Sequence, residues 1–359
     1  MSNYIEYKDK VAFHPGYYIK EIIDESGLTQ DDFAKRLDTT PKNLSLLIRG
    51  EQSLSTDIAL KLSRMLGTSI SYWQNLQDMY DAVAVQRELE ADYEEEKRVF
   101  SLLDYKYFRH YCGLPDLPRK IDEQIKVTRE YLGVSSLTVL SKKDMAVSFR
   151  SAEAGLNEAN IVKANAMVQI AIKKAQERET IKFDKRKFEA AVDYALTQTE
   201  NHSGFYPVVK QAFQEAGVSF VIMPNMSGSK TNGATKKLGG NVMLMVSDRN
   251  LNSDTFWFTL CHEIGHIMNG DFGISFEKET GEAEENADRF ASNCLIPPKE
   301  YKVFTQKKDF SADAIRIFAK SIDRDPGIVL GRLQNDGLVA YDDWSVKNLR
   351  RKYRVVPKV

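Results

Sequence analysis

Apolar residues recur at helical spacing through the first 80 residues and predict five short helices there. The first segment, HPGYYIKEIIDESG, closes on Gly27, and glycine is a typical helix stop. The second and third helices begin after Thr29 and Thr40, whose hydroxyls can cap the free amides of a first turn, and the third ends at Gly50. The segments STDIALKLSRMLG and SISYWQNLQDMYD complete the set. The pattern therefore predicts an all-α domain over residues 1–80.

The pattern changes twice further along the chain. Residues 81–200 are predominantly helical and polar, with breaks at GLPDLPRK and at the turn-rich SFRSAEAGLNEAN, and we interpret them as a helical connector. After residue 205 the helical segment FYPVVKQAFQEAG precedes two apolar runs, VSFVIMP and NVMLMVS, which predict buried strands around the turn-rich SGSKTNGATKKLGG. We therefore expect an α+β domain over residues 201–359, which makes the chain multidomain.

Composition adds a setting for these domains. The 359 residues carry a formal net charge of −1, so any binding of DNA must come from a local patch. No apolar run approaches the roughly 20 residues that cross a bilayer, and the N-terminus lacks the regions of a signal peptide. We therefore expect a cytoplasmic protein with no membrane partner. The three cysteines, Cys112, Cys261 and Cys294, lie far apart and are expected to stay reduced.

The most specific chemical signal is TFWFTLCHEIGHIMNGD, residues 255–271. His262 and His266 are four residues apart and project from one face of a helix, so both can reach the same metal ion. Glu263 lies beside them, where zinc hydrolases of this pattern place the general base. The opposite face is apolar and should pack on the strands, with Ser253 as the cap of the helix. The stretch therefore predicts a Zn²⁺ site.

A second helical segment, GEAEENADRFASNCLIPP, offers further groups for that site. Its apolar residues fix the buried side, and Glu284 lies at the edge of that side, whereas Glu282 and Glu285 point to solvent. Glu284 is therefore the expected third ligand. Asp288, one turn further on, is expected to hold a ligand histidine by its other ring nitrogen. Two histidines and one glutamate leave a coordination position open, as in catalytic zinc sites.

FTLCHEIGH followed by EENADRFASNCLIP resembles the ImmA/IrrE family of zinc metallopeptidases. The similarity includes IVLGRLQNDGLV near the C-terminus and covers roughly residues 205–340. It implies a zincin-like fold, and a repressor protein as the typical substrate. The resemblance also implies His262 and His266 as zinc ligands, Glu284 as the third ligand and Glu263 as the catalytic base.

Cys261 stands where this family commonly has alanine and directly precedes His262. This position raises the alternatives of a fourth ligand or a redox switch. Because the cysteine points about 100° away from the histidine around the helix, a small buried core residue is the better interpretation. Cys294 lies on the apolar side of its own helix and receives the same interpretation.

The segment LTQDDFAKRLDTTPKNLSLLIRGEQSLS has the pattern of a helix-turn-helix. Side chains facing outward near the start of its second helix would meet base edges, and others around it would meet phosphates. The candidate DNA-binding residues are Gln30, Thr40, Lys42, Asn43, Ser45 and Arg49. A helical protein-interaction domain stays open as an alternative, because four nearby acidic residues dilute the positive patch.

The segment from FHPG through LTQ to GTSISYWQNLQ is similar to the HigA-type antitoxin branch of the Cro/repressor-like DNA-binding domains. This resemblance implies a homodimer on a double-stranded DNA operator and, in that branch, sequestration of a toxin. We therefore expect an antitoxin-like, DNA-binding transcriptional regulator whose zinc domain hydrolyses peptide bonds, with a repressor as one substrate. The alternative is a transcription factor or antitoxin whose zinc domain is only sensory or structural. The intact Glu263 favours the peptidase, because a structural site has no use for a base.

Overall fold

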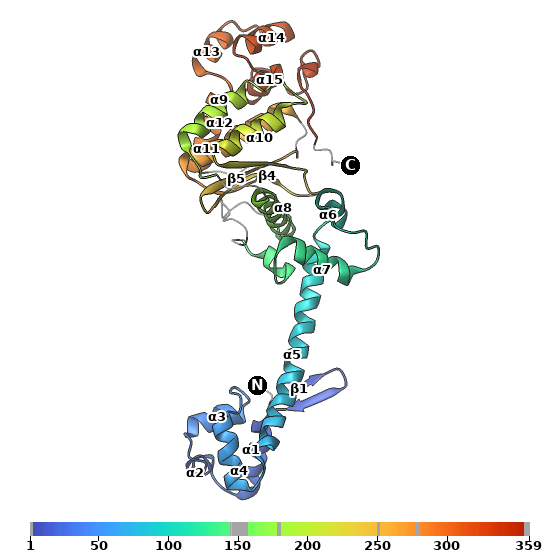
Figure 1. Cartoon of the computed structure of the whole chain (residues 1–359), viewed down its shortest axis with the longest axis vertical. Coiled ribbons are helices and arrows are strands. Elements are labelled where there is room, and N and C mark those ends of the chain that lie inside the picture. Colours follow the sequence, from blue (N-terminus) through green and yellow to red (C-terminus); the bar gives the residue numbers. More distant parts are fainter. Residues whose placement is uncertain are drawn as a thin grey trace. The chain divides into compact units, whose positions relative to one another are not determined.

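The computed structural model describes residues 3–143, 145, 157–177, 181–249, 252–276 and 281–354. The chain forms two compact units, Met1–Glu95 and Glu96–Val359, and each is described by itself. Helix α5 (Ile70–Ser101) runs across the boundary between them (Figure 1). Most of the segment SFRSAEAGLNEAN, expected to be a turn-rich break, lies outside the described residues. The domain boundaries expected at residues 80 and 200 stay predictions.

A hairpin and a set of short helices make up the first unit. Its elements before α5 are β1 (Tyr4–Tyr7), β2 (Lys10–Phe13), α1 (Pro15–Ser26), α2 (Gln30–Arg36), α3 (Pro41–Ile48) and α4 (Thr56–Leu66). The helical domain predicted from the sequence is confirmed, although its fifth helix continues far beyond the expected end. The expectation that the region is all-α missed the hairpin, whose turn has no glycine and places Lys8 at a φ of 54°. A non-glycine turn of this kind gives little sequence signal.

Local signals set the helix starts in this unit. The hydroxyls of Thr29 and Thr40 each accept a hydrogen bond from the amide three residues on, at 3.1 Å, as the caps of α2 and α3. His14 caps α1 by accepting a bond from the Gly16 amide through Nδ1 at 3.0 Å. A Cβ at Gly16 would lie 1.9 Å from the Leu47 carbonyl oxygen, so only glycine lets α1 approach α3 this closely.

The second unit surrounds a four-stranded sheet with helices. The helices before the sheet are α6 (Tyr105–Cys112), α7 (Ile121–Leu132), the 3-10 turn η1 (Leu137–Ser141), α8 (Glu158–Gln176), α9 (Lys185–Leu196) and α10 (Phe205–Glu215). The strands are β3 (Val218–Met223), β4 (Thr231–Leu238), β5 (Asn241–Ser247) and β6 (Gly273–Phe276). The remaining helices are α11 (Ser253–Asn269), α12 (Glu282–Leu295), α13 (Pro298–Gln306), α14 (Ala312–Ser321), α15 (Pro326–Asn335) and the 3-10 turn η2 (Lys347–Leu349).

The sheet has the strand order β3-β5-β4-β6 and mixed directions. β3 is parallel to β5, with Phe220 opposite Leu244, and β4 is antiparallel to both β5 and β6. The segment expected to be turn-rich thus contains the long strand β4, so that expectation was wrong. Its glycine and lysines weaken the strand signal, but pairing with a neighbour on each side satisfies its backbone, and Thr231 and Thr235 are fully buried.

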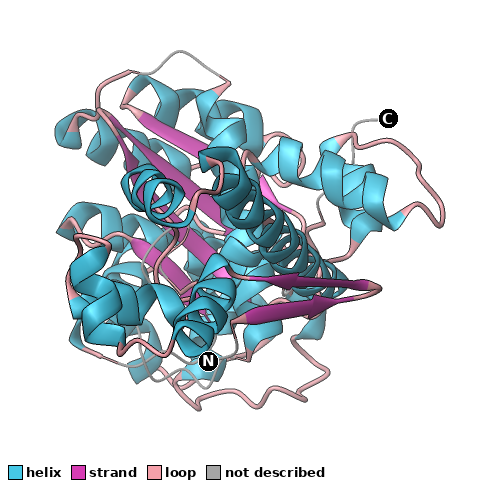
Figure 2. Cartoon of the chain, turned by 90° about the horizontal axis from the view of Figure 1, so that it is seen from below, coloured by secondary structure: helices cyan, strands magenta, loops and turns pink. Residues whose placement is uncertain are grey.

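Helices cover both faces of this sheet (Figures 1 and 2). α8 packs against β3, β4 and β5 on one face, while α10 and α11 pack on the other. All residues of β5 are buried, as expected for a strand with two covered faces. α8 comes from the region expected to be a polar connector, yet Met167, Ile170 and their neighbours on this helix are fully buried. Part of that region therefore belongs to the core that supports the sheet.

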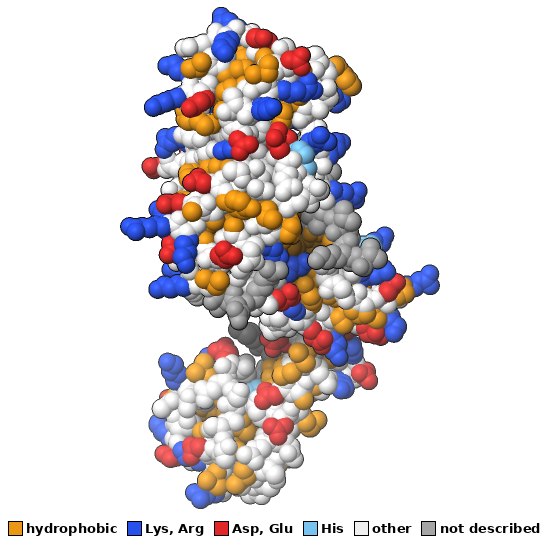
Figure 3. Space-filling model, turned by 45° about the horizontal axis from the view of Figure 1, so that its top comes forward, with side chains coloured by type: hydrophobic (Ala, Val, Ile, Leu, Met, Phe, Trp, Pro, Cys, Tyr) orange, Lys and Arg blue, Asp and Glu red, His pale blue; other side chains and the backbone are white. Residues whose placement is uncertain are grey.

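The surface of the protein carries mixed charges, and no described helix has the character of a membrane span. None of the described helices is long and apolar enough to cross a membrane. Figure 3 shows acidic and basic side chains interspersed over the visible face, in keeping with the net charge of −1.

Candidate metal centre and DNA-reading helix

α11 carries the histidine pair and is anchored at both ends. Its N-cap is Asn252, so the expectation that Ser253 caps the helix was wrong. Ser253 is instead the first helical residue and is fully buried, and its amide donates to the Arg351 carbonyl at 2.9 Å. Gly270 ends the helix at a φ of 75°, as glycine commonly does. The apolar face of α11, including Leu260 and Ile264, is buried as predicted.

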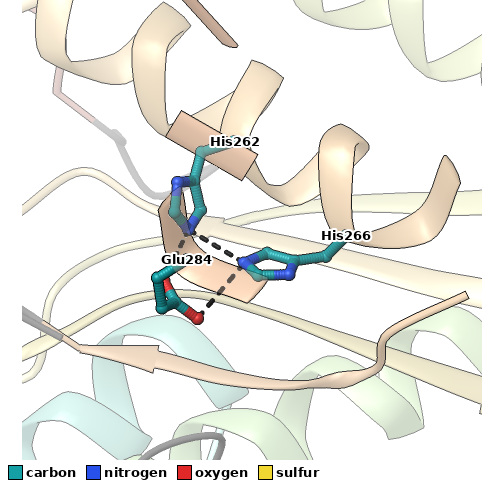
Figure 4. A group of neighbouring side chains, drawn as sticks. All are labelled: His262, His266 and Glu284. Carbon is teal, nitrogen blue, oxygen red and sulfur yellow. Dashed lines mark hydrogen bonds and ion pairs between the residues drawn. The ribbon is translucent and has the colours of Figure 1, made fainter. Parts of the chain in front are cut away.

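The structure brings the three expected ligand residues together (Figure 4). The Nε2 atoms of His262 and His266 are 3.0 Å apart. Glu284 reaches over from α12, with Oε2 at 3.1 Å from His262 Nε2 and Oε1 at 3.4 Å from His266 Nε2. All three ligand atoms lie within 4.8 Å of one another. Glu284 is buried whereas Glu282 and Glu285 are exposed, which is the arrangement predicted for α12.

A carboxylate holds the far side of each imidazole. His262 Nδ1 donates to Asp288 Oδ1 at 2.8 Å, the partner expected from the sequence. His266 Nδ1 donates to Asp271 Oδ2 at 3.0 Å, a contact that sequence reasoning missed. The chain reverses at Gly270, and the Asp271 amide bonds back to the His266 carbonyl at 2.9 Å. The sequence signal for this contact is an aspartate directly after the glycine that ends the helix. When the chain reverses at the glycine, the side chain of the next residue comes back against the last turn of the helix.

The pKa shifts show that this cluster requires positive charge. Burial lowers the pKa of His262, but hydrogen bonds to Asp288 and Glu284 outweigh it and raise the pKa to about 10. Burial raises the pKa of Glu284, but hydrogen bonds from His262 and His266 hold it well below its usual range. Without a cation, a proton on the His262 imidazole therefore has to balance the charge of the neighbouring carboxylates.

These residues fit a divalent metal ion. Because both Nδ1 atoms donate to carboxylates, the Nε2 atoms are left as ligand atoms, and both point at the same place. Glu284 Oε1 is buried, and its contact with His266 Nε2 at 3.4 Å is too long and poorly aligned for a good hydrogen bond. One cation between the three groups would satisfy this oxygen and remove the repulsion between the nitrogen lone pairs. Two nitrogens and one carboxylate form a ligand set typical of catalytic zinc.

Two glycines give the site its close packing. A Cβ at Gly265 would lie 3.2 Å from Ala287 Cα and from the Phe290 side chain, so glycine lets α11 and α12 approach each other. A Cβ at Gly233 of β4 would lie 2.5 Å from Glu263 Oε1. Glu263 is fully buried and fills the space that a side chain on Gly233 would need. Sequence reasoning found Glu263 but neither of these glycines.

The cysteines give no ligand to this cluster. Cys261 is almost fully buried, as expected of a core residue, and Cys294 is only partly buried. Both pack in the apolar core that α11 and α12 share.

The candidate DNA-binding residues gather on and beside α3. Lys42 and Asn43 are exposed near its start, while the Thr40 hydroxyl is engaged as the cap. Arg49 Nε donates to Glu51 Oε1 at 2.9 Å, and Arg49 Nη1 donates to the Ser45 hydroxyl. The apolar residues of α3 face the core of the first unit. Gln30 is the first residue of α2 and is half-buried. The DNA-binding roles of these residues stay predictions.

Known proteins match these same two regions. The helix-turn-helix family matches residues 19–73, and the family of IrrE N-terminal-like domains matches residues 214–315. The HTH-type transcriptional regulator YddM of Escherichia coli (strain K12) is 32% identical over 80 residues, which are 22% of this chain and 85% of the relative. Virulence-associated protein I of Dichelobacter nodosus is 32% identical over 71 residues, 20% of this chain and 66% of that protein. A crystal structure described as an antidote protein of a plasmid maintenance system from Nostoc punctiforme is 30% identical, with a TM-score of 0.23, and the match covers 23% of this chain and 91% of that one.

The fold and the two sites define a DNA-binding regulator joined to an α+β domain with a His-His-Glu cluster. The chain belongs to the helix-turn-helix transcriptional regulators and carries, in its C-terminal region, an IrrE/ImmA-like domain of the metallopeptidase type.

Proposed function

We propose that this protein is a transcriptional regulator whose C-terminal domain is a zinc-dependent endopeptidase. Its substrate class is a protein, and a repressor is the candidate that the ImmA/IrrE resemblance suggests. His262, His266 and Glu284 hold the zinc, and Glu263 is the catalytic base. Zinc bound there supplies Lewis-acid chemistry for hydrolysis of a peptide bond.

The observation that carries the proposal is Glu263 itself. A glutamate that only supported a structural metal would need no place beside the ligands, and no glycine opposite it. Here the carboxylate is buried next to the histidine pair, and Gly233 leaves room for it. In the reaction, Glu263 takes a proton from the attacking water and passes it to the leaving amine, as a general base and then a general acid. Asp288 and Asp271 keep the two imidazoles oriented.

The first unit provides sequence-specific binding to DNA. A single helix-turn-helix reads only one half-site, so we propose that two copies bind a palindromic operator with half-site centres about 34–36 Å apart. Selection from a randomised pool of DNA duplexes with the full chain tests this part. A selected motif without twofold symmetry would contradict binding as a dimer.

The peptidase is tested with the full chain loaded with Zn²⁺ and a peptide library made from a whole proteome. Mass spectrometry of new termini should show cleavage by the wild type and about 10²- to 10⁴-fold slower cleavage by Glu263→Gln, the range attributed to general acid–base catalysis. Zinc content should be equal in both, because Glu263 is not a ligand. The chain itself is followed in the same samples for self-cleavage.

Equal cleavage by the two proteins would remove Glu263 from the mechanism. If both retained one equivalent of zinc and neither cut any peptide or itself, the domain would be a sensory or structural module. Selection of the same DNA motif by both proteins serves as the control for intact folding.

A further inference from the structure

The second unit contains a cavity that the metal centre does not use. It has a volume of about 210 Å³ and lies between α11, α12, α15 and the segment around Arg350. A pocket for a drug-sized ligand usually has about 300 to 1,000 Å³, so this one suits a smaller molecule. It is also far larger than the roughly 10–15 Å³ that a single water needs by the same kind of measure.

A buried ion pair forms the polar wall of the cavity. Arg350 Nη2 lies 2.8 Å from Asp254 Oδ2, and the Asp254 side chain is only 7% exposed. Two further polar atoms of the pair, Asp254 Oδ1 and Arg350 Nε, are buried and make no hydrogen bond within the described residues. Buried polar atoms without partners are costly, so a ligand that satisfies both would gain free energy.

The rest of the lining combines apolar side chains with the polar Thr255, Ser292, Arg332 and Asn335. Ile296 and Ile328 are buried, Phe258 is half-buried, and the largely exposed Tyr341 stands at the rim. Gly331 of α15 faces Asp254, and a Cβ there would lie 2.7 Å from Asp254 Oδ2. Glycine at this position therefore keeps the carboxylate uncovered by a side chain from α15.

From this arrangement we propose that the cavity binds a free apolar L-amino acid. Its ammonium group donates to Asp254 Oδ1, its carboxylate accepts from Arg350 Nε, and its side chain packs on Phe258, Ile296 and Ile328. Because both atoms are buried in the free protein, the Arg350 side chain, which is 25% exposed, has to move away from Asp254 so that the ligand can enter between the two charges. Arg332 also lines the cavity but is paired with Asp336 at 2.9 Å. The opposite charges of Asp254 and Arg350 therefore favour a zwitterion over a simple cation or anion, and the volume limits the ligand to about one residue.

The cavity lies beside the metal centre on the same helix. Asp254, Phe258 and His262 follow one another at four-residue spacing along one face of α11. The Phe258 and His262 rings have centroids 6.4 Å apart. An occupant of the cavity would thus pack one helical turn from a metal ligand. Binding to this cavity does not require peptidase activity.

Isothermal titration of the full-length protein with L-leucine, L-methionine and L-phenylalanine tests the proposal. At least one should bind with a Kd below about 1 mM, the affinity that corresponds to about 4 kcal/mol. Asp254→Asn keeps the shape but removes the charge and should weaken binding about 10- to 100-fold. Ser292→Phe fills the cavity from α12 and should abolish binding. Its matched control, Asn293→Phe, places the same ring on an exposed position of α12 that does not line the cavity and should bind normally.

Three outcomes would overturn the proposal. The first is that the wild-type protein, shown to be folded by its circular dichroism spectrum, binds none of the three amino acids at about 10 mM, ten times the expected upper limit of Kd. Another is unchanged binding in Ser292→Phe. The third is equal binding of N-acetyl-leucinamide, which has no charges and imitates a residue within a polypeptide, because the cavity would then be a subsite for a peptide substrate.

Discussion

The proposed DNA-reading helix α3 and the proposed metal-binding helix α11 present their candidate functional groups at opposite extremes of exposure. Lys42 and Asn43 of α3 project into solvent, and only the apolar face of that helix is tied into the core. On α11, in contrast, Glu263 and His266 are fully buried. A reading surface must be free to meet a long rigid duplex, whereas a hydrolytic site must exclude bulk water and hold charges in place.

This difference decides what each region needs around its functional residues. Exposed polar groups are solvated by water and need no protein partner. Buried histidines and carboxylates need paired charges, which Asp288 and Asp271 supply from outside the ligand set. A substitution in the metal centre should therefore disrupt the whole site, whereas a substitution on α3 should remove a single contact.

The largest effect is expected for Glu284→Ala. Removing the third ligand leaves two imidazoles and no charge of opposite sign on the ligand set, so the purified protein should lose most of its zinc. Glu285→Ala is the matched control, because it removes an exposed carboxylate from the same helix, and it should keep one equivalent. Metal analysis of both proteins makes the test. Full zinc content in Glu284→Ala would show that another group closes the site.

Gly233→Ala should come next, with an effect on catalysis but not on metal. The new Cβ would lie 2.5 Å from Glu263 Oε1, so the carboxylate has to move. A displacement of about 1 Å can cost about 100-fold in rate, which is the loss expected in the peptide-library assay. Gly240→Ala is the control, because a Cβ at this nearby glycine would meet only Lys182 Cγ, at 3.9 Å. An unchanged rate in Gly233→Ala would mean that Glu263 tolerates displacement.

The two regions also differ in how much of their structure could be predicted from the sequence. In the first unit, helix starts and stops depend on neighbouring residues, so Thr29, Thr40 and Gly27 located α1 to α3 correctly. The hairpin β1–β2 escaped because its turn uses Lys8 at a positive φ rather than glycine. Close approaches such as that of Gly16 to Leu47 join distant parts of the chain, and no periodicity reveals them.

In the second unit the clustering of the candidate ligands was predictable and their surroundings were not. His262, His266 and Glu284 follow from helical spacing on two amphipathic helices, and the structure places all three in one cluster. β4 could not be foreseen, because its burial comes from pairing with β5 and β6 rather than from its own apolar content. The positions of Gly233 against Glu263 and of Asp254 against Arg350 likewise depend on how distant elements meet.

The histidine partners should show an intermediate effect. Asp271→Asn and Asp288→Asn each retain the shape but weaken the hydrogen bond that orients an imidazole, and zinc affinity should fall about 10- to 100-fold. Asp271 is half-buried and contacts the fully buried His266, whereas Asp288 is exposed to solvent. We therefore expect the Asp271 substitution to lower zinc affinity more. Competition with a chelating dye measures both affinities. Equal affinities in all three proteins would show that the outer carboxylates do not tune the site.

The smallest effects should come from the DNA-reading helix. Lys42→Ala and Asn43→Ala each remove a single exposed side chain, and each should weaken binding to the selected operator by about 1 to 3 kcal/mol if it reaches a base. Neither should change the free energy of unfolding by more than about 0.5 kcal/mol, since surface groups contribute little to stability. Lys20→Ala serves as the control, because it removes an exposed lysine from α1, where it pairs with Asp24.

Gel-shift titration at fixed salt measures the binding, and it has to be repeated with unrelated duplexes. A base contact lowers affinity for the operator alone, whereas a phosphate contact lowers affinity for every duplex and reduces the slope of binding against salt by about one charge. Lys42 can do either, but the Asn43 amide carries no charge and should leave the salt slope unchanged. Operator affinity that stays the same in both variants would mean that α3 does not enter the groove by its N-terminal end, and the comparison between an open reading surface and a closed metal centre would then need a different reading helix.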